Sequence, residues 1–465
     1  MIVSTPWRRG LVATLVAGLL VLLSGCVQGD ARNTSPDSIK VWIVEDLPDR
    51  VAATQRIVDD FTRSSGVQVQ LVAVAEDQFN QLLLSSAAAG TLPDVVGGVP
   101  LGQVRTMSSN ELLDPAATAA VLDDLGRDTF TRQALDLTSD RGTPLAVPSE
   151  AWTQLLLYRK DLFDAKGLAA PTTYESVRAA AQALKTPDQS GFIGATVAGD
   201  SFTEQTFEYW AQANGCQLVD DTGKVTFDSP ACVEALRTYG QLVREDGPPG
   251  AQDVDTTRAS YFAGRSAMTV WSTFILDEMA GLRDDAKPTC PQCEADPAFL
   301  AKNTGIVTAI KGPQGARPTV FGEVTSWVIT AAASAGPARR FVEHMMSDGY
   351  QPWIAIAPEG KVPVRTGTAD DRQRFSKAWA GLDVGVDSRA PLSRFYSPEV
   401  IDEIASGPQE LSRWAIPQGQ GDLLGALQGE QPVAEAVNEV SNGTDPAQAA
   451  RQATDTVVSI QESLQ

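Results

Sequence analysis

Adjacent carboxylates are the side chains of this sequence best suited to acid–base chemistry. Glu45–Asp46 and Asp123–Asp124 each place two such groups side by side. Glycoside hydrolysis needs two carboxyl groups roughly 5–9 Å apart, and adjacency in sequence does not supply that geometry. The sequence has no G-x-S-x-G, H-E-x-x-H or P-loop motif, and its one histidine, His344, argues against a His-rich zinc site or a Ser-His-Asp triad. We therefore expect binding without catalysis, with no cofactor and no metal, and keep glycan hydrolysis as an alternative.

The first 26 residues are typical of an exported lipoprotein. Arg8 and Arg9 precede an uncharged apolar segment, 11–23, which is short for a membrane span. The segment ends in Leu-Ser-Gly-Cys26, which resembles the bacterial lipobox, in which the cysteine is acylated and becomes the first residue after cleavage. The pattern predicts a signal peptide over 1–25, a lipid anchor on Cys26 and a polar, flexible tether over 26–38. The alternative is a plain secretory signal with an incidental cysteine.

The composition argues against several classes of partner. The 465 residues include 37 Lys and Arg against 58 Asp and Glu, which gives a net charge of −21. Nucleic-acid phosphates and anionic lipid headgroups repel so acidic a chain, so we expect no nucleic-acid partner. With 43% hydrophobic and 20% charged residues, the chain can bury large cores, and its length allows two or three domains. We expect an extracytoplasmic, monomeric protein.

The cysteines after the signal region agree with an oxidising compartment. They are Cys216, Cys232, Cys290 and Cys293, which allow three pairings. We favour Cys216–Cys232 and Cys290–Cys293 because the members of each pair are close in sequence. The first pair closes a loop of about 16 residues, worth roughly 3 kcal/mol in the chain-entropy model. A Cys-x-x-Cys redox motif is the alternative for the second pair, but the neighbouring Pro288 favours a structural staple in a loop.

Alternating strands and helices must position any site. Apolar and β-branched runs predict strands at 39–44, 67–74 and 92–96, with helices between them. This order implies right-handed βαβ units and a mainly parallel sheet. The pattern restarts with a strand at 155–158 and a helix over 172–184, which begins with a capping box. The sequence therefore predicts an α/β protein with two lobes.

Eight short stretches occur in an order that matches a known family. They are Gly90-Thr-Leu-Pro-Asp-Val95, Glu111-Leu-Leu-Asp114, Leu145-Ala-Val-Pro148, Leu157-Tyr-Arg-Lys-Asp-Leu-Phe163, Pro171-Thr-Thr-Tyr-Glu175, Asn214-Gly215, Tyr261-Phe-Ala-Gly-Arg-Ser-Ala-Met268 and Ser326-Trp-Val-Ile329. These stretches follow a lipobox-like tetrad in the chain. Together they resemble those of the extracytoplasmic solute-binding proteins of carbohydrate ABC importers, of the maltodextrin- and oligosaccharide-binding type. The resemblance covers nearly all of 39–465.

The resemblance implies a two-lobed periplasmic-binding-protein fold of type II with three hinge crossovers. Carried over to this chain, lobe I comprises 39–147 and 272–331, and lobe II comprises 152–268 and 334–465. The expected crossovers lie near 148–151, 268–271 and 330–333. A ligand would bind between the lobes, beyond the carboxyl ends of parallel strands, and hinge closure would bring both lobes onto it.

A carbohydrate ligand defines which side chains to seek there. Sugar C–H faces pack on aromatic rings, and hydroxyl groups pair with carboxylates, amides and guanidinium groups. The candidates after predicted strands are Glu45, Asp46, Glu76, Asp77, Gly98, Gln103 and Glu204. The candidates at the crossovers and in the carboxyl-terminal part are Glu150, Trp152, Trp271, Phe274, Glu323, Trp327, Tyr396 and Trp414. The resemblance marks Trp152 as a ligand-contact position and Trp271 as a stacking aromatic.

The resemblance implies that the protein captures a carbohydrate, a neutral di- or oligosaccharide, and delivers it to the permease of an ABC transporter. A protein of the same fold could instead bind a polyamine, a phosphodiester or a metal chelate. A phosphorylated ligand would need clustered Arg and Lys or helix N-termini. Because the candidate positions are mostly acidic or aromatic, they favour a neutral sugar. The net negative charge of the chain keeps a cationic ligand as an alternative.

Overall fold

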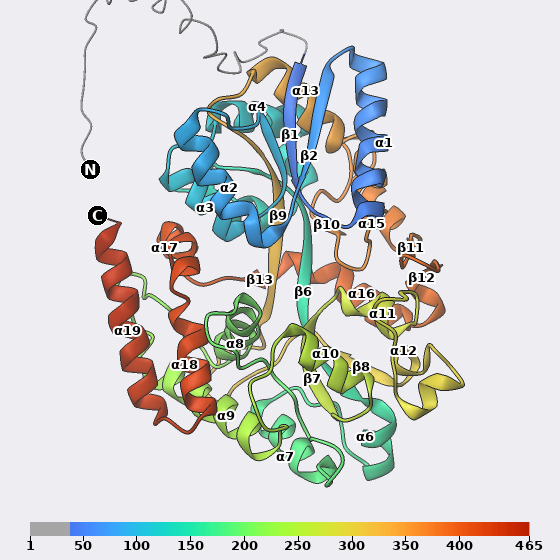
Figure 1. Cartoon of the computed structure of the whole chain (residues 1–465), viewed down its shortest axis with the longest axis vertical. Coiled ribbons are helices and arrows are strands. Elements are labelled where there is room, and N and C mark those ends of the chain that lie inside the picture. Colours follow the sequence, from blue (N-terminus) through green and yellow to red (C-terminus); the bar gives the residue numbers. More distant parts are fainter. Residues whose placement is uncertain (1–37, 465) are drawn as a thin grey trace, which may run out of the picture.

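A computed structural model describes residues 38–464, apart from the side chain of Asp77. These residues form two lobes, one above the other in Figure 1, joined by strands that run through the middle of the molecule. The predicted signal peptide, the predicted anchor Cys26 and the tether up to residue 37 lie outside the described residues. Within residues 38–464, no helix is long and apolar enough to cross a membrane.

The sheet of lobe I is mixed, so the expectation of a mainly parallel sheet is wrong: antiparallel strands adjoin its three parallel ones. β1 (Ser38–Val44) pairs in parallel with β2 (Gln68–Val74) and with β3 (Val95–Pro100). Proline at the first position favours the start of α1 (Pro48–Ser65), and Gly66 ends it in the left-handed conformation. The predicted βαβ order is thus confirmed. The other helices of this lobe are α2 (Glu76–Ala89), α3 (Leu101–Ser109), α4 (Pro115–Leu125), α5 (Arg132–Leu137), α13 (Ala335–Met345) and α14 (Tyr350–Ile354).

Two long strands connect the lobes. The first half of β6 (Val147–Arg159) pairs antiparallel with β9 (Val320–Ile329), which also pairs with β3 in lobe I. The second half of β6 instead pairs with β7 (Met268–Ser272) and β8 (Thr304–Val307). Because β6 belongs to the sheets of both lobes, it forms a continuous passage between them.

Helices surround the strands of lobe II. They are α6 (Lys160–Lys166), α7 (Tyr174–Leu184), α8 (Ser201–Ala213), α9 (Pro230–Glu245), α10 (Val254–Phe262), α18 (Pro432–Ser441) and α19 (Pro446–Ser463). Their aromatic core includes Tyr174 and Trp210, whose rings stack 3.9 Å apart. The favoured disulfides, Cys216–Cys232 and Cys290–Cys293, are both present.

Smaller elements lie around the junction of the lobes. They are β4 (Ser139–Asp140), β5 (Thr143–Pro144), α11 (Ile275–Met279), α12 (Phe299–Asn303), β10 (Val362–Pro363), α15 (Arg374–Trp379), β11 (Asp383–Val384), β12 (Ala390–Pro391), α16 (Pro398–Ser406), β13 (Leu411–Ser412) and α17 (Gly421–Ala426). β13 pairs with the beginning of β9, and α17 lies against α3. The segment from β13 to α17 therefore connects the carboxyl-terminal part of the chain to lobe I.

The packing differs from the expected division of the chain in three places. Segment 272–331 was expected in lobe I, but α11, α12 and β8 lie with lobe II, because β8 pairs with the second half of β6. The passage expected at 268–271 is likewise a strand of lobe II, and the chain returns to lobe I through β9. Segment 334–465 was expected in lobe II, but α13 packs on α4 and β1 of lobe I.

Candidate ligand-binding cleft

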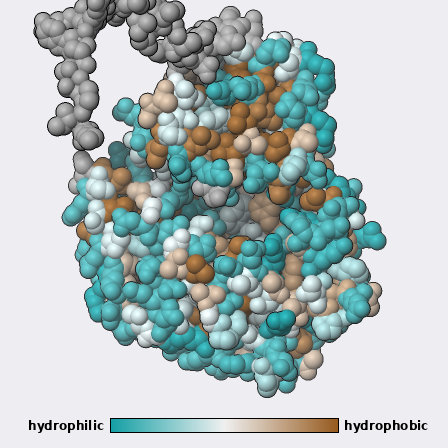
Figure 2. Space-filling model, viewed as in Figure 1, coloured by the Kyte–Doolittle hydropathy of each residue, from teal (hydrophilic) through white to brown (hydrophobic). Residues whose placement is uncertain are grey.

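A hollow lies between the two lobes at mid-height in Figure 2. In Figure 1, β1 of lobe I and α8 of lobe II approach the junction from above and below, and β13 and β10 lie at it. The passage strands β6 and β9 run beside them. Side chains on these elements are therefore the candidates for contact with a ligand held by both lobes.

Helix α8 presents two carboxylates near the junction. Asp200 caps the helix by accepting hydrogen bonds from the backbone N–H groups of Phe202 and Thr203. Glu204 and Glu208 lie one helical turn apart and hence on one face. Glu208 accepts hydrogen bonds at Oε1 from the backbone of Trp414, at 2.8 Å, and from Gln212 Nε2. The fold beyond β13 therefore holds this carboxylate in place.

Glu208 belongs to a group that also includes Glu204, Glu323 and Arg413, called the acidic cluster below. Arg413, directly after β13, forms an ion pair with Glu323 on β9, and its Nε lies 3.4 Å from Glu208 Oε1. Glu323 also accepts a hydrogen bond of 3.0 Å from the backbone N–H of Leu101, the first residue of α3. The cluster thus joins lobe I, a passage strand and lobe II.

Burial shifts the pKa of both Glu204 and Glu208 on α8 upwards. Burial raises the pKa of Glu204 to about 7, and the neighbouring charge of Glu208 adds to this increase while Arg413 opposes it. Burial also raises the pKa of Glu208. Glu204 is nevertheless only half-buried, and its side chain has no hydrogen-bond or ion-pair partner within the described part of the chain. Glu204 is therefore a partly accessible carboxylate that a ligand could use as a hydrogen-bond acceptor.

Aromatic rings lie on α8 and on a passage strand. Phe202, on α8, lies 4.8 Å from the ring of Trp271 on β7, with an interplanar angle of 56°. Trp271 is buried, whereas Phe202 is half-buried. On the passage strands, the half-buried Trp152 is opposite Glu323 in the pairing of β6 with β9. Trp152 is therefore an accessible ring beside the acidic cluster, whereas Phe202 packs on Trp271, which lies against Arg258.

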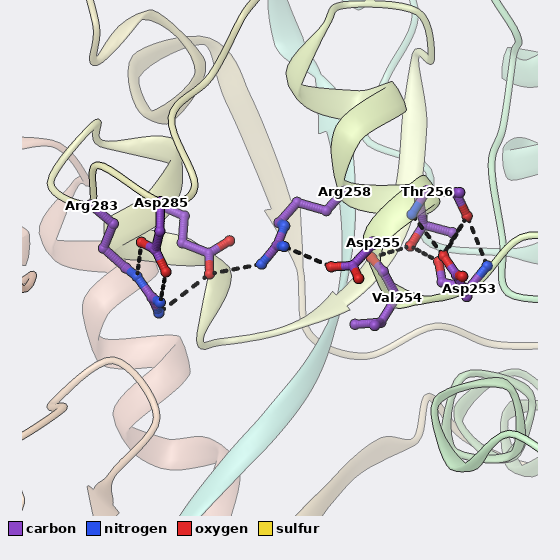
Figure 3. Close-up of polar contacts among 9 residues, drawn as sticks. Asp253, Val254, Asp255, Thr256, Arg258, Arg283 and Asp285 are labelled. Atoms are coloured by element: carbon purple, nitrogen blue, oxygen red, sulfur yellow. Dashed lines mark hydrogen bonds and ion pairs between the residues drawn. The ribbon is translucent and has the colours of Figure 1, made fainter. Parts of the chain in front are cut away.

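A second group of charges lies on the other side of the passage strands. Arg258 bridges Asp255 and Glu278, and Arg283 bridges Glu278 and Asp285 (Figure 3). With Arg50, Asp277 and Glu359, the residues Arg258, Glu278 and Arg283 form what we call the hinge-side network. Arg50, on α1 of lobe I, lies 3.6 Å from Glu359 and 3.4 Å from Glu45. This network connects α1 with α11.

Burial is the main cause of pKa shifts in the hinge-side network. It raises the pKa of Glu359 to about 8, of Glu278 to about 7 and of Asp277 to about 6. The two carboxylate oxygens of Asp277 have no hydrogen-bond partner among residues 38–464. The guanidinium groups nearby lower these values only in part.

Several predicted site residues have other partners or lie in the core. Glu150 accepts hydrogen bonds from Trp353 Nε1 at 2.8 Å and from Lys361 Nζ at 2.7 Å, so it stabilises the passage between lobes. Trp327, Trp414 and Tyr396 are buried in the core. The rings of these three residues are covered, so a ligand cannot stack on them in this structure.

The remaining candidates lie near the junction without forming one continuous surface. Glu45 accepts hydrogen bonds from the backbone N–H groups of Asp46 and Leu47, each at 3.1 Å, just before α1, and Asp46 is exposed. Gly98 adopts a φ of 75° beside Val44. Gln103 is buried on α3, and Phe274 lies beneath the guanidinium group of Arg50. Glu76 is exposed at the start of α2, and the side chain of Asp77 is not among the described parts of the structure.

Sequence reasoning missed Glu208 and Arg413 in the acidic cluster and Arg50, Asp277 and Glu359 in the hinge-side network. Glu208 follows Glu204 by four residues, a helical spacing that could have identified it. Arg413 precedes the candidate Trp414 directly, but only the pairing of β13 with β9 brings it to Glu323. The acidic residues of the network lie on segments that no local pattern connects.

A separate cavity of about 650 Å³ lies on lobe II, between α7, α9 and the loop around Lys311. Its rim carries Arg178, Glu175 and Glu234. Tyr174 and Trp210 line it, but their faces are stacked on each other and both residues are buried. This cavity therefore offers no free aromatic face and lies apart from the interlobe residues described above.

Comparison with known proteins places the fold in a family. Residues 45–352 match the model for the bacterial extracellular solute-binding protein family. The chain is 27% identical over 351 residues to YcjN of Escherichia coli (strain K12), which carries the name of an ABC transporter periplasmic-binding protein; the match covers 74% of this chain and 76% of that protein. It is 28% identical over 174 residues to the mannitol-binding protein of Pseudomonas aeruginosa, covering 35% of this chain and 40% of that protein.

Solved structures share the two-lobed architecture. The GacH receptor of Streptomyces glaucescens, solved unliganded and with acarbose, has a TM-score of 0.69 at 20% identity, over 91% of this chain and 98% of the receptor. A sugar transporter protein of Arthrobacter chlorophenolicus with bound laminaribiose has a TM-score of 0.68 at 17% identity, over 91% and 99%. The chain therefore has the two-lobed fold predicted from its sequence and belongs to the bacterial extracellular solute-binding protein family.

Proposed function

We propose that this protein captures a carbohydrate in the cleft between its lobes and delivers it, unaltered, to the permease of an ABC transporter. The observation that carries the proposal is the position of Glu204. This carboxylate is half-buried and unpartnered within the described residues, and it belongs to the acidic cluster, in which the half-buried Trp152 lies opposite Glu323. A free acceptor beside an accessible ring is the combination that a sugar requires, with hydroxyl groups on its rim and C–H groups on its faces.

Hinge closure would complete the site. In this proposal, β6 and β9 bend at the junction, and α3 of lobe I approaches α8 of lobe II. The proteins named above for acarbose and laminaribiose share the fold, which supports a carbohydrate as the class of ligand. Buried, ion-paired groups such as Glu150 would maintain the hinge and would make no contact with the sugar.

Lipid anchoring is a second part of the proposal. It depends on the lipobox-like tetrad that ends at Cys26 and on the polar segment that follows it. Acylation of Cys26 would hold the protein at the outer face of the cell membrane, where capture and transfer to a permease take place. A Cys26→Ser variant should lose incorporation of a labelled fatty acid and move from the membrane fraction to the medium; continued membrane association would reject the anchor.

Calorimetric titration with mono-, di- and oligosaccharides tests the proposal, followed by chromatography of the sugar recovered from the complex. We expect saturable binding of at least one carbohydrate and recovery of the intact molecule. A cleaved product would instead favour a glycoside hydrolase. If no carbohydrate bound to correctly folded protein, another class of solute would have to be sought.

A further inference from the structure

The acidic cluster contains more negative charge than the protein around it balances. Its three carboxylates, on Glu204, Glu208 and Glu323, are influenced by a single cation, Arg413. Within residues 38–464, no other Lys or Arg forms an ion pair with any of them. Two of the three negative charges are therefore without a counter-charge when the carboxylates are ionised.

Buried carboxylates are costly unless they are paired or protonated. A cluster with this excess of negative charge therefore calls for a proton or for a positively charged partner.

Unused hydrogen-bond acceptors accompany the unbalanced charge. Glu208 is completely buried, and its Oε2 has no partner in the described part of the chain. Gln103 lies on the first turn of α3, close to the Leu101 N–H that binds Glu323, and its buried Oε1 is also unpartnered among residues 38–464. Glu204 adds a half-exposed carboxylate. The unpaired atoms of these three residues accept hydrogen bonds, so a donor would satisfy them; Arg413 Nε, an unpaired donor, already lies 3.4 Å from Glu208 Oε1.

We infer that the acidic cluster binds a protonated amino group of the ligand, so that the solute is an amino-bearing carbohydrate rather than a neutral one. The inference rests on the proposed function and narrows its class of substrate. An ammonium group donates three hydrogen bonds and accepts none, and it supplies a positive charge. A hydroxyl group donates one hydrogen bond and would leave the charge unbalanced.

Protonation of Glu204 is the competing way to reduce the negative charge. The carboxyl group would then donate one hydrogen bond, and a neutral sugar would fit as well as an amino sugar. The two possibilities differ in what substitution of Glu204 does to the preference between ligands. Glu204 suits this test because its side chain makes no hydrogen bond whose loss would disturb the fold of the described residues.

Affinity should be measured by calorimetry at pH 7.5 with glucose and maltose, with their 6-amino-6-deoxy and 2-amino-2-deoxy analogues, and with spermidine. We expect at least one amino analogue to bind about tenfold more tightly than its neutral parent. In Glu204→Gln this preference should fall to about twofold or less, while Glu204→Asp retains most of it. Glu435→Gln, on the exposed face of α18, is the control and should leave the preference unchanged. Circular dichroism verifies that each variant is folded.

The other outcomes overturn the inference in distinguishable ways. If a neutral sugar binds as tightly as its amino analogues, the inference is wrong and the proposal of carbohydrate capture stands. If spermidine alone binds, the cluster recognises a cation that is not a sugar and both fail. If no probe binds to the folded protein, the carbohydrate proposal fails as well.

Discussion

A Cβ atom placed on Gly425 would lie 2.8 Å from the carbonyl oxygen of Gly102, so α17 and α3 meet with no room for a side chain between them. The same atom would lie 2.7 Å from Thr106 Oγ1. Nearby, Asn80 Nδ2 donates a hydrogen bond of 3.4 Å to Gln428 Oε1. This close contact fixes the segment after β13, which carries Arg413, against lobe I.

Substitution of Gly425 tests the importance of this contact. In Gly425→Ala, the added methyl group must displace backbone atoms of α3, and overpacking of this kind costs about 1–3 kcal/mol. We expect a lower midpoint in urea denaturation by that amount. Gly429→Ala is the matched control, because nothing lies within 4 Å of a Cβ at that position. Equal stability of the two variants would show that α17 and α3 separate freely.

Two aromatic residues near the junction, Phe202 and Trp271, should respond differently to truncation. Phe202 is half-buried, so Phe202→Ala should weaken carbohydrate binding at least about tenfold, equivalent to 1.4 kcal/mol, with a smaller loss of stability. Trp271 is buried between Phe202 and Arg258, so Trp271→Ala should destabilise the fold by about 3–5 kcal/mol. Calorimetry and thermal unfolding on both variants separate these effects. Unchanged affinity in Phe202→Ala would remove this ring from the site.

The alternation of strands and helices was predictable because its signals are local. Pro48 at the start of α1, Gly66 at its end and the β-branched run that became β1 each act within a few residues. The helix over α7 likewise begins with a capping box, which pairs Thr173 with Ser176, one position later than the Thr172–Glu175 box expected from the sequence. Such features depend on chain stereochemistry and neighbouring side chains, so the sequence alone suffices.

The lobe boundaries and the ion pairs could not be predicted from the sequence, because they depend on contacts between residues far apart in the chain. The apolar run at 268–271 has the same local character whether its strand lies within one lobe or passes between two, and only its pairing with the second half of β6 decides the matter. Glu323 and Arg413 are 90 residues apart. Trp327 and Trp414 resembled ligand-binding aromatics by position, but tertiary packing buried both.

Stability should fall as the pH rises, because of the hinge-side network. The pKa of Glu359 is raised to about 8 from an ordinary value of 4.5, so the folded state binds more protons than the unfolded state between these values. The stabilisation is complete below about pH 4.5 and is lost as the pH passes through about 8. We expect a melting temperature several degrees higher at pH 5.5 than at pH 8.5, since each pKa unit corresponds to about 1.4 kcal/mol.

The variant Glu359→Gln isolates this contribution. It removes the titrating group near Arg50 and Asp277, so the difference between the two melting temperatures should shrink. Glu462→Gln, at the exposed end of α19, should behave as the wild type. A pH dependence unchanged in Glu359→Gln would assign the effect to other carboxylates.

The two disulfides should contribute unequally to stability. Cys216–Cys232 closes a loop with a sequence separation of 16, whereas Cys290–Cys293 has a separation of 3. In the chain-entropy model, the longer loop restricts the unfolded chain more, and its bond is worth about 3 kcal/mol. The double variant Cys216→Ser, Cys232→Ser should therefore lower the free energy of unfolding more than Cys290→Ser, Cys293→Ser, as measured by urea denaturation. The reverse order would mean that packing around Cys290 and Cys293, both buried, outweighs loop entropy.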